Sequence, residues 1–451
     1  MLLQLKLKNF KSFGGETLFS MLPKRVHKKK HHVFAADKNA PGVLRLGLCY
    51  GKNSAGKTNL IDAVSFARKM VRNDFKLSEG DKIDVPQYKF TEMPETFFDF
   101  IIRIDSLIYR YFFSVTKEKV TGEELYKINK WHAKEDMRVY ELMLKREGDA
   151  IAAESLNRVG NEEFKVFLQN RSVKSNQLIL NKLMEDGLRK YDEQTPQSKA
   201  FLDVYDWFGH IVTVYTNTAF GSWETMHEEK DFSPFINDFL HKADLGISKV
   251  DFKNTLVTDD ELKEKYKTLK EGESAAYSKP NKRIIHKQDG ELFIQELCTE
   301  HNGKTFMISE ESRGSRRVLD LLPLFFMAHT PKYKNSLFLV DEFDTGLDSV
   351  LSKKLLDMFL NDAGINQNTQ LIASTHEPEL LDLGKETKAM VAEGKKSEGV
   401  RQDELFFFRR NAEGNTTIAR IKEGKVRFDK ALPRTYLNNT IYDFLEEDNQ
   451  N

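Results

Sequence analysis

One eight-residue stretch, residues 51–58, constrains this chain more than any other. It reads Gly-Lys-Asn-Ser-Ala-Gly-Lys-Thr and fits the pattern G-x-x-x-x-G-K-[ST] at every fixed position. The apolar run before it, 44–50, is typical of a buried strand, and the run after it, 59–70, has apolar residues at helical spacing. A loop between a strand and a helix can direct several backbone N–H groups at an anion. The stretch therefore predicts a phosphate-binding loop.

The residues of this loop have separate expected roles. Lys57 is expected to reach the outer phosphates of ATP, and the Thr58 hydroxyl to hold Mg²⁺. The other nucleotide-binding candidates in and beside the loop are Gly51, Asn53, Ser54, Ala55, Gly56 and Asn59. The sequence thus predicts ATP as the substrate and Mg²⁺ as the cofactor.

Composition narrows the class of protein. The 69 basic and 69 acidic side chains cancel, so the total charge gives no general attraction to nucleic acid or acidic membranes. The two cysteines form no disulfide framework, which suits a reducing cytosol. Lysines interrupt the first apolar residues, and no uncharged apolar run is long enough to span a bilayer. We therefore expect a cytoplasmic protein without a membrane part.

The residue pattern divides the chain into three parts. Residues 1–149 combine the phosphate loop with strand-like segments. Residues 150–290 have a mainly helical pattern that becomes highly charged and loop-like from 258, which predicts a helical insertion with an exposed, mobile loop. Residues 291–451 return to strands and read as the second half of the nucleotide domain. The expected fold class is α/β, with a mixed sheet around the phosphate loop and an antiparallel β subdomain.

Two local patterns in the first part lead to specific expectations. Residues 96–104 and 107–115 read as a hairpin that turns at Asp105 and Ser106. Residues 24–32 form a basic run that is too polar to pack, so we expect a solvated surface loop. The alternative for this run is a patch that contacts phosphates of a nucleic acid.

Two later apolar strands end in residues that suit nucleotide chemistry. The strand starting at 336 ends in Asp341 and Glu342, and a buried strand delivers such carboxylates to the ligand edge of an α/β sheet. Asp341 is expected to hold Mg²⁺ through water, and Glu342 to polarise the attacking water or accept its proton. The next apolar strand, 369–375, ends in His376, which we expect beside the γ-phosphate.

Ser312 and Gly314 precede an apolar helix expected over 318–327. A serine and a glycine at a helix N-terminus form an anion site, because the hydroxyl and the first N–H groups point outward. This second anion site lies a short way before the acidic strand in the sequence.

The order of these motifs resembles the ABC-type ATPases, and within them the SMC-like and OLD-like branch. The shared order is phosphate loop, long insertion, Ser-x-Gly helix, acidic strand and strand-terminal histidine. The run Leu-Lys-Asn-Phe-Lys-Ser-Phe at 7–13 is also typical of that branch. The resemblance implies an ABC-type ATPase head with an inserted helical subdomain.

The resemblance also implies a site shared between two copies. Ser312 and Gly314 match the signature loop that reaches the ATP of the other subunit, and Asp348 matches a residue that lines the dimer seam. Arg313 stands where the usual signature has a glycine, so we expect the contact in trans with less than its usual strength.

Three more residues receive roles by resemblance. His376 matches the switch at the γ-phosphate, and Lys11 matches a basic residue that lies near the nucleotide. Gln87 is a candidate for the glutamine loop and so for a further Mg²⁺ ligand.

The chain is further similar to stand-alone ATPases of bacterial anti-phage systems, in particular the AriA ATPases of PARIS systems. That resemblance implies a homo-oligomer, from paired heads up to a hexamer, which holds a separate effector nuclease of Toprim type and releases it on an infection cue. The resemblance is also compatible with a phage-encoded protein as the trigger of this release. The segment after His376 is too short for an attached nuclease domain of typical size, so we expect any nuclease to be a separate protein.

Two rival functions come from other classes. The first is an SMC-like ATPase that clamps DNA in repair or maintenance. The sequence alone does not decide whether the chain binds nucleic acid. The second is a metabolic nucleotide hydrolase or kinase, against which the Ser-x-Gly helix argues, because such enzymes need no signature in trans.

Overall fold

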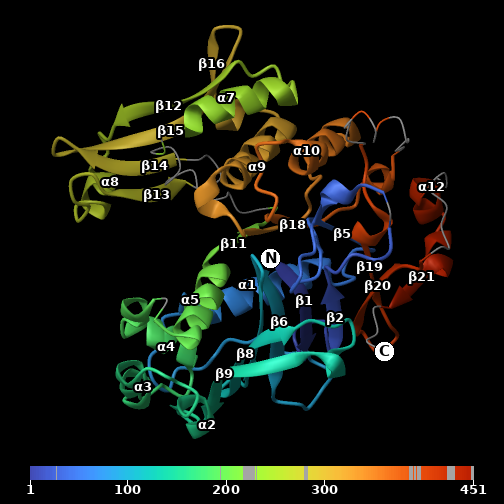
Figure 1. The fold of residues 1–451 in the computed structure, drawn as a ribbon. Helices are drawn as coiled ribbons and strands as arrows, with labels where there is room; N and C mark the ends of the chain where they lie inside the picture. Colours follow the sequence, from blue (N-terminus) through green and yellow to red (C-terminus); the bar gives the residue numbers. More distant parts are fainter. Residues whose placement is uncertain are drawn as a thin grey trace. The chain divides into compact units, whose positions relative to one another are not determined.

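The computed structural model describes residues 1–26, 28–192, 194–216, 229, 231–278, 283–384, 390, 393, 398–423 and 432–447 (Figure 1). The chain folds into two compact units. The first consists of Met1–Thr213, Lys334–Leu339 and Gln367–Asn451, and the second of Val214–Tyr333 and Val340–Asn366. Among the described residues, each helix is too short or too polar to cross a lipid bilayer.

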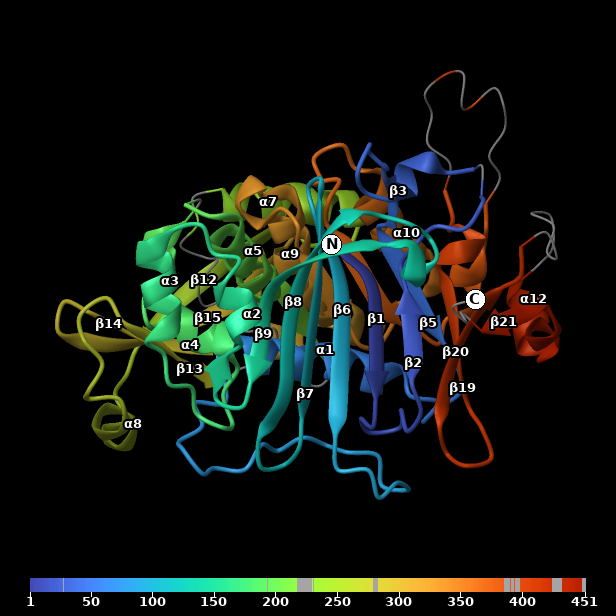
Figure 2. The ribbon, with the colours of Figure 1, turned by 60° about the horizontal axis from the view of Figure 1, so that its bottom comes forward.

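One seven-stranded antiparallel sheet lies in the first unit, and Figure 2 shows its long central strands side by side. Its order is β10-β9-β8-β7-β6-β1-β2. The strands are β1 (Leu2–Lys8), β2 (Thr17–Ser20), β6 (Thr96–Ile104), β7 (Leu107–Val115), β8 (Val120–Lys130), β9 (Val139–Glu147) and β10 (Ala150–Ile151). β6 and β7 pair from end to end and turn at Asp105, whose φ is 51°. The predicted hairpin is confirmed.

A second seven-stranded sheet carries the phosphate loop, and its order is β11-β17-β18-β5-β19-β20-β21. β18 and β19 run parallel to β5, while β20 is antiparallel to β19. All five residues of β5 are buried, as expected for a strand covered on both faces. The strands are β11 (Ile211–Val214), β17 (Leu337–Val340), β18 (Gln370–Ser374), β5 (Leu46–Tyr50), β19 (Leu405–Arg410), β20 (Thr416–Ile421) and β21 (Leu445–Glu447), and β3 (Val33–Phe34) pairs separately with β4 (Val43–Leu44).

Aromatic side chains hold the helices of the first unit against its antiparallel sheet. The Phe66 ring lies 5.6 Å from the Phe98 ring of β6, and the Phe208 ring lies 5.1 Å from the Phe100 ring. The helical pattern expected after residue 150 is present up to residue 209, and Phe208 belongs to the last of these helices. The helices are α1 (Lys57–Arg72), α2 (Ala153–Leu156), α3 (Glu162–Gln169), α4 (Ile179–Glu185), α5 (Pro196–Gly209) and α12 (Leu432–Leu437).

The second unit combines helices with a separate antiparallel sheet. α7 (Phe232–Ala243) packs on α9 (Arg313–His329), with the Phe239 and Phe325 rings 4.7 Å apart. The sheet has the order β12-β15-β14-β13, and β16 also pairs with β15. Its strands are β12 (Lys249–Leu256), β13 (Ser274–Ser278), β14 (Arg283–Gln288), β15 (Glu291–His301) and β16 (Lys304–Met307). Among the described residues, the unit also contains α8 (Asp260–Lys265) and α10 (Ser349–Asn361).

The loop-like segment expected over 258–290 is instead α8, β13 and β14. These elements enclose a small core in which Val257, Ile285 and Leu292 are buried against the side chains of Leu262 and Tyr266. The sequence pattern hides this core, because charged residues dominate the segment and its few apolar residues are scattered among them. Residues 280–282, which looked most loop-like, lie outside the described residues.

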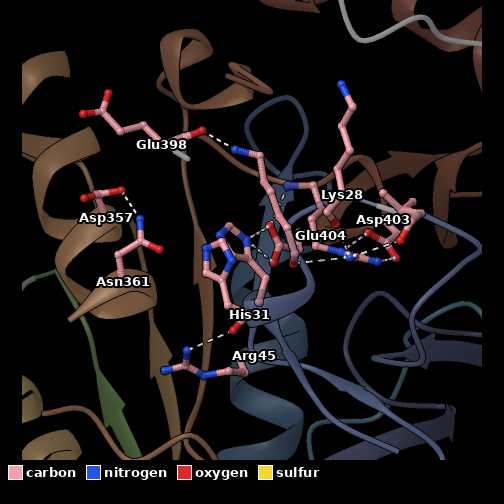
Figure 3. A network of polar contacts seen from close by, with 12 residues as sticks. Lys28, His31, Arg45, Asp357, Asn361, Glu398, Asp403 and Glu404 are labelled. Carbon is pink, nitrogen blue, oxygen red and sulfur yellow. Dashed lines mark hydrogen bonds and ion pairs between the residues drawn. The ribbon is translucent and has the colours of Figure 1, made fainter. Parts of the chain in front are cut away.

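The basic run at 24–32 does not form the solvated loop that its charge predicts (Figure 3). Lys29 and His32 are 1% and 0% exposed. The Lys29 ammonium donates to the Glu398 carbonyl, and His32 Nδ1 lies 3.0 Å from Glu404 Oε1. The prediction was wrong because the acceptors that let these side chains be buried come from the far end of the chain. His27 lies outside the described residues.

The fold class is α/β, as predicted from the sequence, with a mixed sheet around the phosphate loop and a separate antiparallel sheet.

Candidate functional site

The phosphate loop joins β5 to α1 and needs its glycines for two reasons. Gly51 and Gly56 have φ values of 152° and 107°, which side chains with a Cβ rarely adopt. A Cβ on Gly51 would lie 2.6 Å from the Phe408 carbonyl oxygen, and one on Gly56 would lie 2.4 Å from Thr416 Oγ1. Any other residue at these positions would force the loop away from β19 and β20.

Lys57 is the only lysine of this loop that is buried, with 6% exposure. Its ammonium folds back over the loop and donates to the Gly51 carbonyl at 2.7 Å, with the Lys52 carbonyl at 3.4 Å. Residues 52–54 and Thr58 are exposed. An ammonium on the inner side of an exposed loop at a helix N-terminus fits the phosphates of a nucleotide, so the residues present suit the expected ligand.

A chain of side-chain hydrogen bonds braces the loop from behind. Asn59 Nδ2 donates to Ser12 Oγ at 2.6 Å, and the Ser12 and Thr416 hydroxyls lie 2.8 Å apart. Thr416 Oγ1 in turn donates to the Ala55 carbonyl at 2.9 Å. Ser12 and Thr416 are buried, so each hydroxyl depends on the others for its partners. Sequence reasoning gave neither of them a role: Ser12 stood in a noted motif, but no local signal marks Thr416.

Lys11 and Gln87 lie on neighbouring segments of the first unit. Lys11 Nζ forms an ion pair with Asp62 of α1 at 2.6 Å, and its backbone N–H donates to the Pro86 carbonyl at 2.7 Å. Gln87 follows Pro86, and its side-chain amide donates to the Pro94 carbonyl. Lys11 is thus held beside the helix that starts at Lys57, and Asp62 is a contact that sequence reasoning missed.

His376 lies at the same edge of the sheet as the phosphate loop. β18 is parallel to β5 with Ser374 opposite Cys49, and the chain beyond each strand therefore emerges side by side. The Tyr50 hydroxyl donates to the Glu377 carbonyl at 3.2 Å, which ties the residue before the loop to the residue after His376. The His376 side chain is exposed.

The C-terminal helix α12 returns to the start of the phosphate loop. The Tyr436 ring lies 5.5 Å from the Tyr50 ring in an edge-to-face arrangement. Burial raises the pKa of the Tyr436 hydroxyl, and a hydrogen bond with the Gly51 backbone partly offsets that effect. Sequence reasoning gave Tyr436 no place in the site, because nothing local to it points to residue 51.

Asp341 and Glu342 directly follow β17 in the chain and belong to the second unit. Asp341 is 8% exposed, and its N–H donates to the Val214 carbonyl at 2.9 Å. Glu342 has a φ of 47°, in the left-handed region that costs energy for a residue with a Cβ. Glu342 Oε2 accepts hydrogen bonds from the hydroxyls of Thr216 and Thr345, both at 3.1 Å. The side chain of Glu342 is therefore held in one orientation.

The predicted signature residues begin α9 in the same unit. The exposed Ser312 is the N-cap, and its Oγ accepts from the Ser315 N–H at 3.0 Å. A Cβ on Gly314 would lie 3.0 Å from the Gly346 carbonyl oxygen, so the turn after Glu342 packs directly on this helix start. Asp348 caps α10 and accepts from the Leu351 N–H at 2.8 Å. The second unit thus brings Ser312, Gly314 and Asp348 to one region.

Glu311 fixes the chain immediately before Ser312. Its Oε1 accepts hydrogen bonds from the Thr299 hydroxyl and from His301 Nε2, the latter at 2.7 Å. Burial alone would raise the pKa of Glu311, but these hydrogen bonds outweigh it and hold the pKa below its usual value. Glu311 is therefore ionised at neutral pH and anchors the signature to β15.

Comparison with known proteins gives one family and one structural likeness. A family model described as "AAA domain, putative AbiEii toxin, Type IV TA system" matches residues 50–382. No curated protein matches the chain. Among solved structures, the SMC head domain from Thermotoga maritima is similar with a TM-score of 0.38 and 14% identity, over 93% of this chain and 99% of that chain. That score is too low to support any inference about activity.

Proposed function

Because this chain belongs to the family described as AAA domain, putative AbiEii toxin, Type IV TA system, a family of nucleotide-binding ATPases, we propose that it is a Mg²⁺-dependent ATPase that joins copies of itself around ATP. The observation that carries the proposal is the phosphate loop, with the buried Lys57 ammonium turned over exposed backbone.

The proposed roles of the residues follow from their chemistry. Lys57 binds the β- and γ-phosphates, while the N–H groups of residues 52–56 surround them. Thr58 would bind Mg²⁺ directly, and Asp341 would bind it through a water molecule. Gln87 is a further candidate ligand. When bound, Mg²⁺ supplies positive charge that neutralises the phosphates. These groups position ATP and would stabilise the negative charge on the transferred γ-phosphoryl group and on the ADP that leaves.

Glu342 is the proposed base that accepts a proton from the attacking water. The hydrogen bonds from Thr216 and Thr345 support this role, because they fix the carboxylate before the reaction begins. His376 is proposed to sense the γ-phosphate from the neighbouring strand end, which its exposed side chain leaves accessible. Lys11, held beside α1 by its ion pair with Asp62, is proposed to lie near the nucleotide.

We further propose that each ATP is bound by two copies of the chain. In this arrangement Ser312 and Gly314 of one copy contact the nucleotide of the other, and Asp348 lines the seam. One observation supports it: the Ser312 side chain is exposed at the N-terminus of α9. Gly314 has a role within the chain as well, because a Cβ there would lie 3.0 Å from the Gly346 carbonyl oxygen. ATP binding then assembles the copies, and hydrolysis separates them.

The biological role that we propose is that of a sensor or scaffold in anti-phage defence. ATP-driven assembly would hold a separate effector nuclease and release it when a phage-encoded trigger appears. The family description supports a role that involves a second protein, since a toxin–antitoxin system has two components. The resemblance to AriA ATPases of PARIS systems supports the Toprim-type nuclease as that partner.

The alternative, an SMC-like clamp on DNA, loses one of its supports. It relied in part on the basic run at 24–32 as a phosphate-contacting patch. Lys29 and His32 of that run are buried, and they contact the protein's own Glu398 and Glu404 instead. The remaining basic residues of the run and the neutral total charge give little to attract a duplex.

We expect the full chain, co-expressed with the product of its neighbouring gene, to form a stable complex when ATP is present. The measurement is native mass with ATP and with ADP, using Glu342→Gln to hold the ATP state and Glu291→Gln, an exposed acid at the start of β15, as its control. A parallel titration with duplex DNA at two salt concentrations tests the clamp. Salt-dependent DNA binding without any protein complex in either nucleotide state would contradict the sensor role.

A further inference from the structure

Arg317 of α9 binds the backbone of the turn that contains the acidic pair. One of its terminal nitrogens donates to the carbonyls of Asp341 and Glu342, both at 2.8 Å, and Nε reaches the Phe343 carbonyl at 3.4 Å. The side chain is 4% exposed. A single guanidinium thus contacts three consecutive carbonyls of the Asp341–Glu342–Phe343 turn.

Burial of the Arg317 guanidinium removes water from its charge, which is unfavourable unless other groups compensate. Burial lowers the pKa of Arg317, and the charges of Asp320 and Asp344 are the first of several acidic groups that oppose the effect. The planar fork of arginine can span adjacent acceptors, whereas a lysine ammonium acts as a point charge. The contacts made here therefore require arginine in particular.

The backbone that Arg317 holds is unfavourable on its own. Glu342 has a φ of 47° although it carries a side chain, a conformation that costs energy and persists only where surrounding contacts impose it. Arg317 binds the carbonyl of that residue, and Thr216 and Thr345 bind its carboxylate. The strained backbone and the fixed side chain belong to the same residue.

The helix that provides Arg317 is also the helix that begins at the signature. Ser312 caps α9, and Arg317 lies about one turn further along it. Gly314 of the first turn packs on Gly346, which follows Glu342 by four residues. A movement of the first turn of α9 would reach Glu342 through these two contacts.

We propose that Arg317 is a positioning residue that links the signature end of α9 to the orientation of Glu342. This inference rests on the proposed function, because Glu342 must be the hydrolytic base for the link to matter. Contact between Ser312 and the nucleotide of a second copy stabilises one position of α9, and Arg317 transmits that position to the Glu342 backbone. Hydrolysis then becomes fast only in the assembled state.

Arg317→Lys is expected to lower kcat for ATP about 100-fold, since small misplacements of a catalytic group have effects of that size. KM should change less than about threefold, because the lysine variant leaves the phosphate loop intact. In Arg317→Ala, millimolar guanidinium is expected to restore part of the lost turnover, while urea at the same concentration restores none. A purely structural role predicts no such rescue.

Arg146→Lys is the matched control for loss of a buried arginine. Arg146 is 8% exposed and donates to the carbonyls of Gly148 and Gln177 at 2.6 and 2.7 Å. Arg146→Lys should therefore lose about as much stability as Arg317→Lys, while its kcat stays unchanged. In a Glu342→Gln background, Arg317→Lys should add no further loss of kcat, since both changes act through one residue.

Two results would overturn the link between α9 and Glu342. One is a wild-type kcat in Arg317→Lys, and the other is an equal loss of kcat in Arg317→Lys and Arg146→Lys at equal thermal stability. An additive loss in the double variant would do the same. Failure of the proposed function would be recognised differently: ATP turnover would persist in the Lys57→Ala variant, purified in the same way.

Discussion

Replacing Lys57 by alanine is expected to abolish measurable ATP binding and turnover. The Lys57 ammonium is the only buried side-chain cation of the phosphate loop, and hydrogen bonds to charged groups contribute roughly 1.5–3 kcal/mol each. Two such bonds to phosphate oxygens correspond to a rise of about 100-fold or more in Kd. Isothermal titration with ATP and a phosphate-release assay measure the two effects separately.

Lys69→Ala serves as the control for this variant, because Lys69 is an exposed lysine on the same helix α1. It should bind and hydrolyse ATP like the wild type. Thermal unfolding must show that Lys57→Ala is folded, since Lys57 also donates to the Gly51 carbonyl. A folded Lys57→Ala protein with wild-type affinity and turnover would remove the phosphate loop from the account.

Replacing Glu342 by glutamine should separate binding from hydrolysis. The amide cannot accept a proton from water, so kcat is expected to fall about 10²–10⁴-fold. ATP affinity should be retained, because the Lys57 loop is unchanged. Glutamine keeps an oxygen that can accept from the hydroxyls of Thr216 and Thr345, so the local fold should survive. Single-turnover kinetics measure the chemical step directly.

Because hydrolysis is proposed to separate the copies, Glu342→Gln should also accumulate the assembled state with ATP. Light scattering or native mass spectrometry would show a larger species with ATP than with ADP, and Glu291→Gln should return to the smaller species as ATP is consumed. Unchanged steady-state turnover would exclude Glu342 as the base. If Glu342→Gln loses turnover as expected but has the same native mass with ATP as with ADP, the proposed link between ATP binding and assembly is contradicted.

The elements predicted well are those whose signal is local. The phosphate loop has a fixed spacing, and β6 and β7 are long apolar strands around a two-residue turn, so their pairing follows from the chain itself. The strand before the loop and the strand that ends at Ser374 are continuous apolar runs, as buried parallel strands must be. These features also fix where the candidate site lies along the sequence.

The features missed by sequence reasoning depend on distant partners. Lys29 and His32 looked like solvated charges because Glu398 and Glu404 lie more than 360 residues away. Thr416 braces the phosphate loop through Ala55, which is 361 residues earlier in the chain. Nothing in the sequence around Thr416 points to residue 55. Such contacts become visible only when the sheet has brought the two ends of the chain together.

The contacts around Glu342 show the same limit at shorter range. The acidic pair after β17 is apparent from the sequence, but the left-handed backbone at Glu342 is not, because glutamate rarely adopts it. Arg317 and Thr216 lie on other segments, and only the folded second unit places them on that turn. The residues of the candidate site could thus be named from the sequence, whereas the contacts that position them could not.

The central claim is that two copies share each ATP, and mixing two inactive variants tests it most directly. Lys57→Ala lacks the phosphate-binding cation and Ser312→Ala lacks the signature hydroxyl, so each should be nearly inactive alone. In a mixed pair one site carries both defects and the other carries none. An equal mixture that exchanges freely should regain up to about a quarter of wild-type turnover. Turnover no higher than that of either variant alone, with mixed oligomers detected by native mass spectrometry, would contradict the claim.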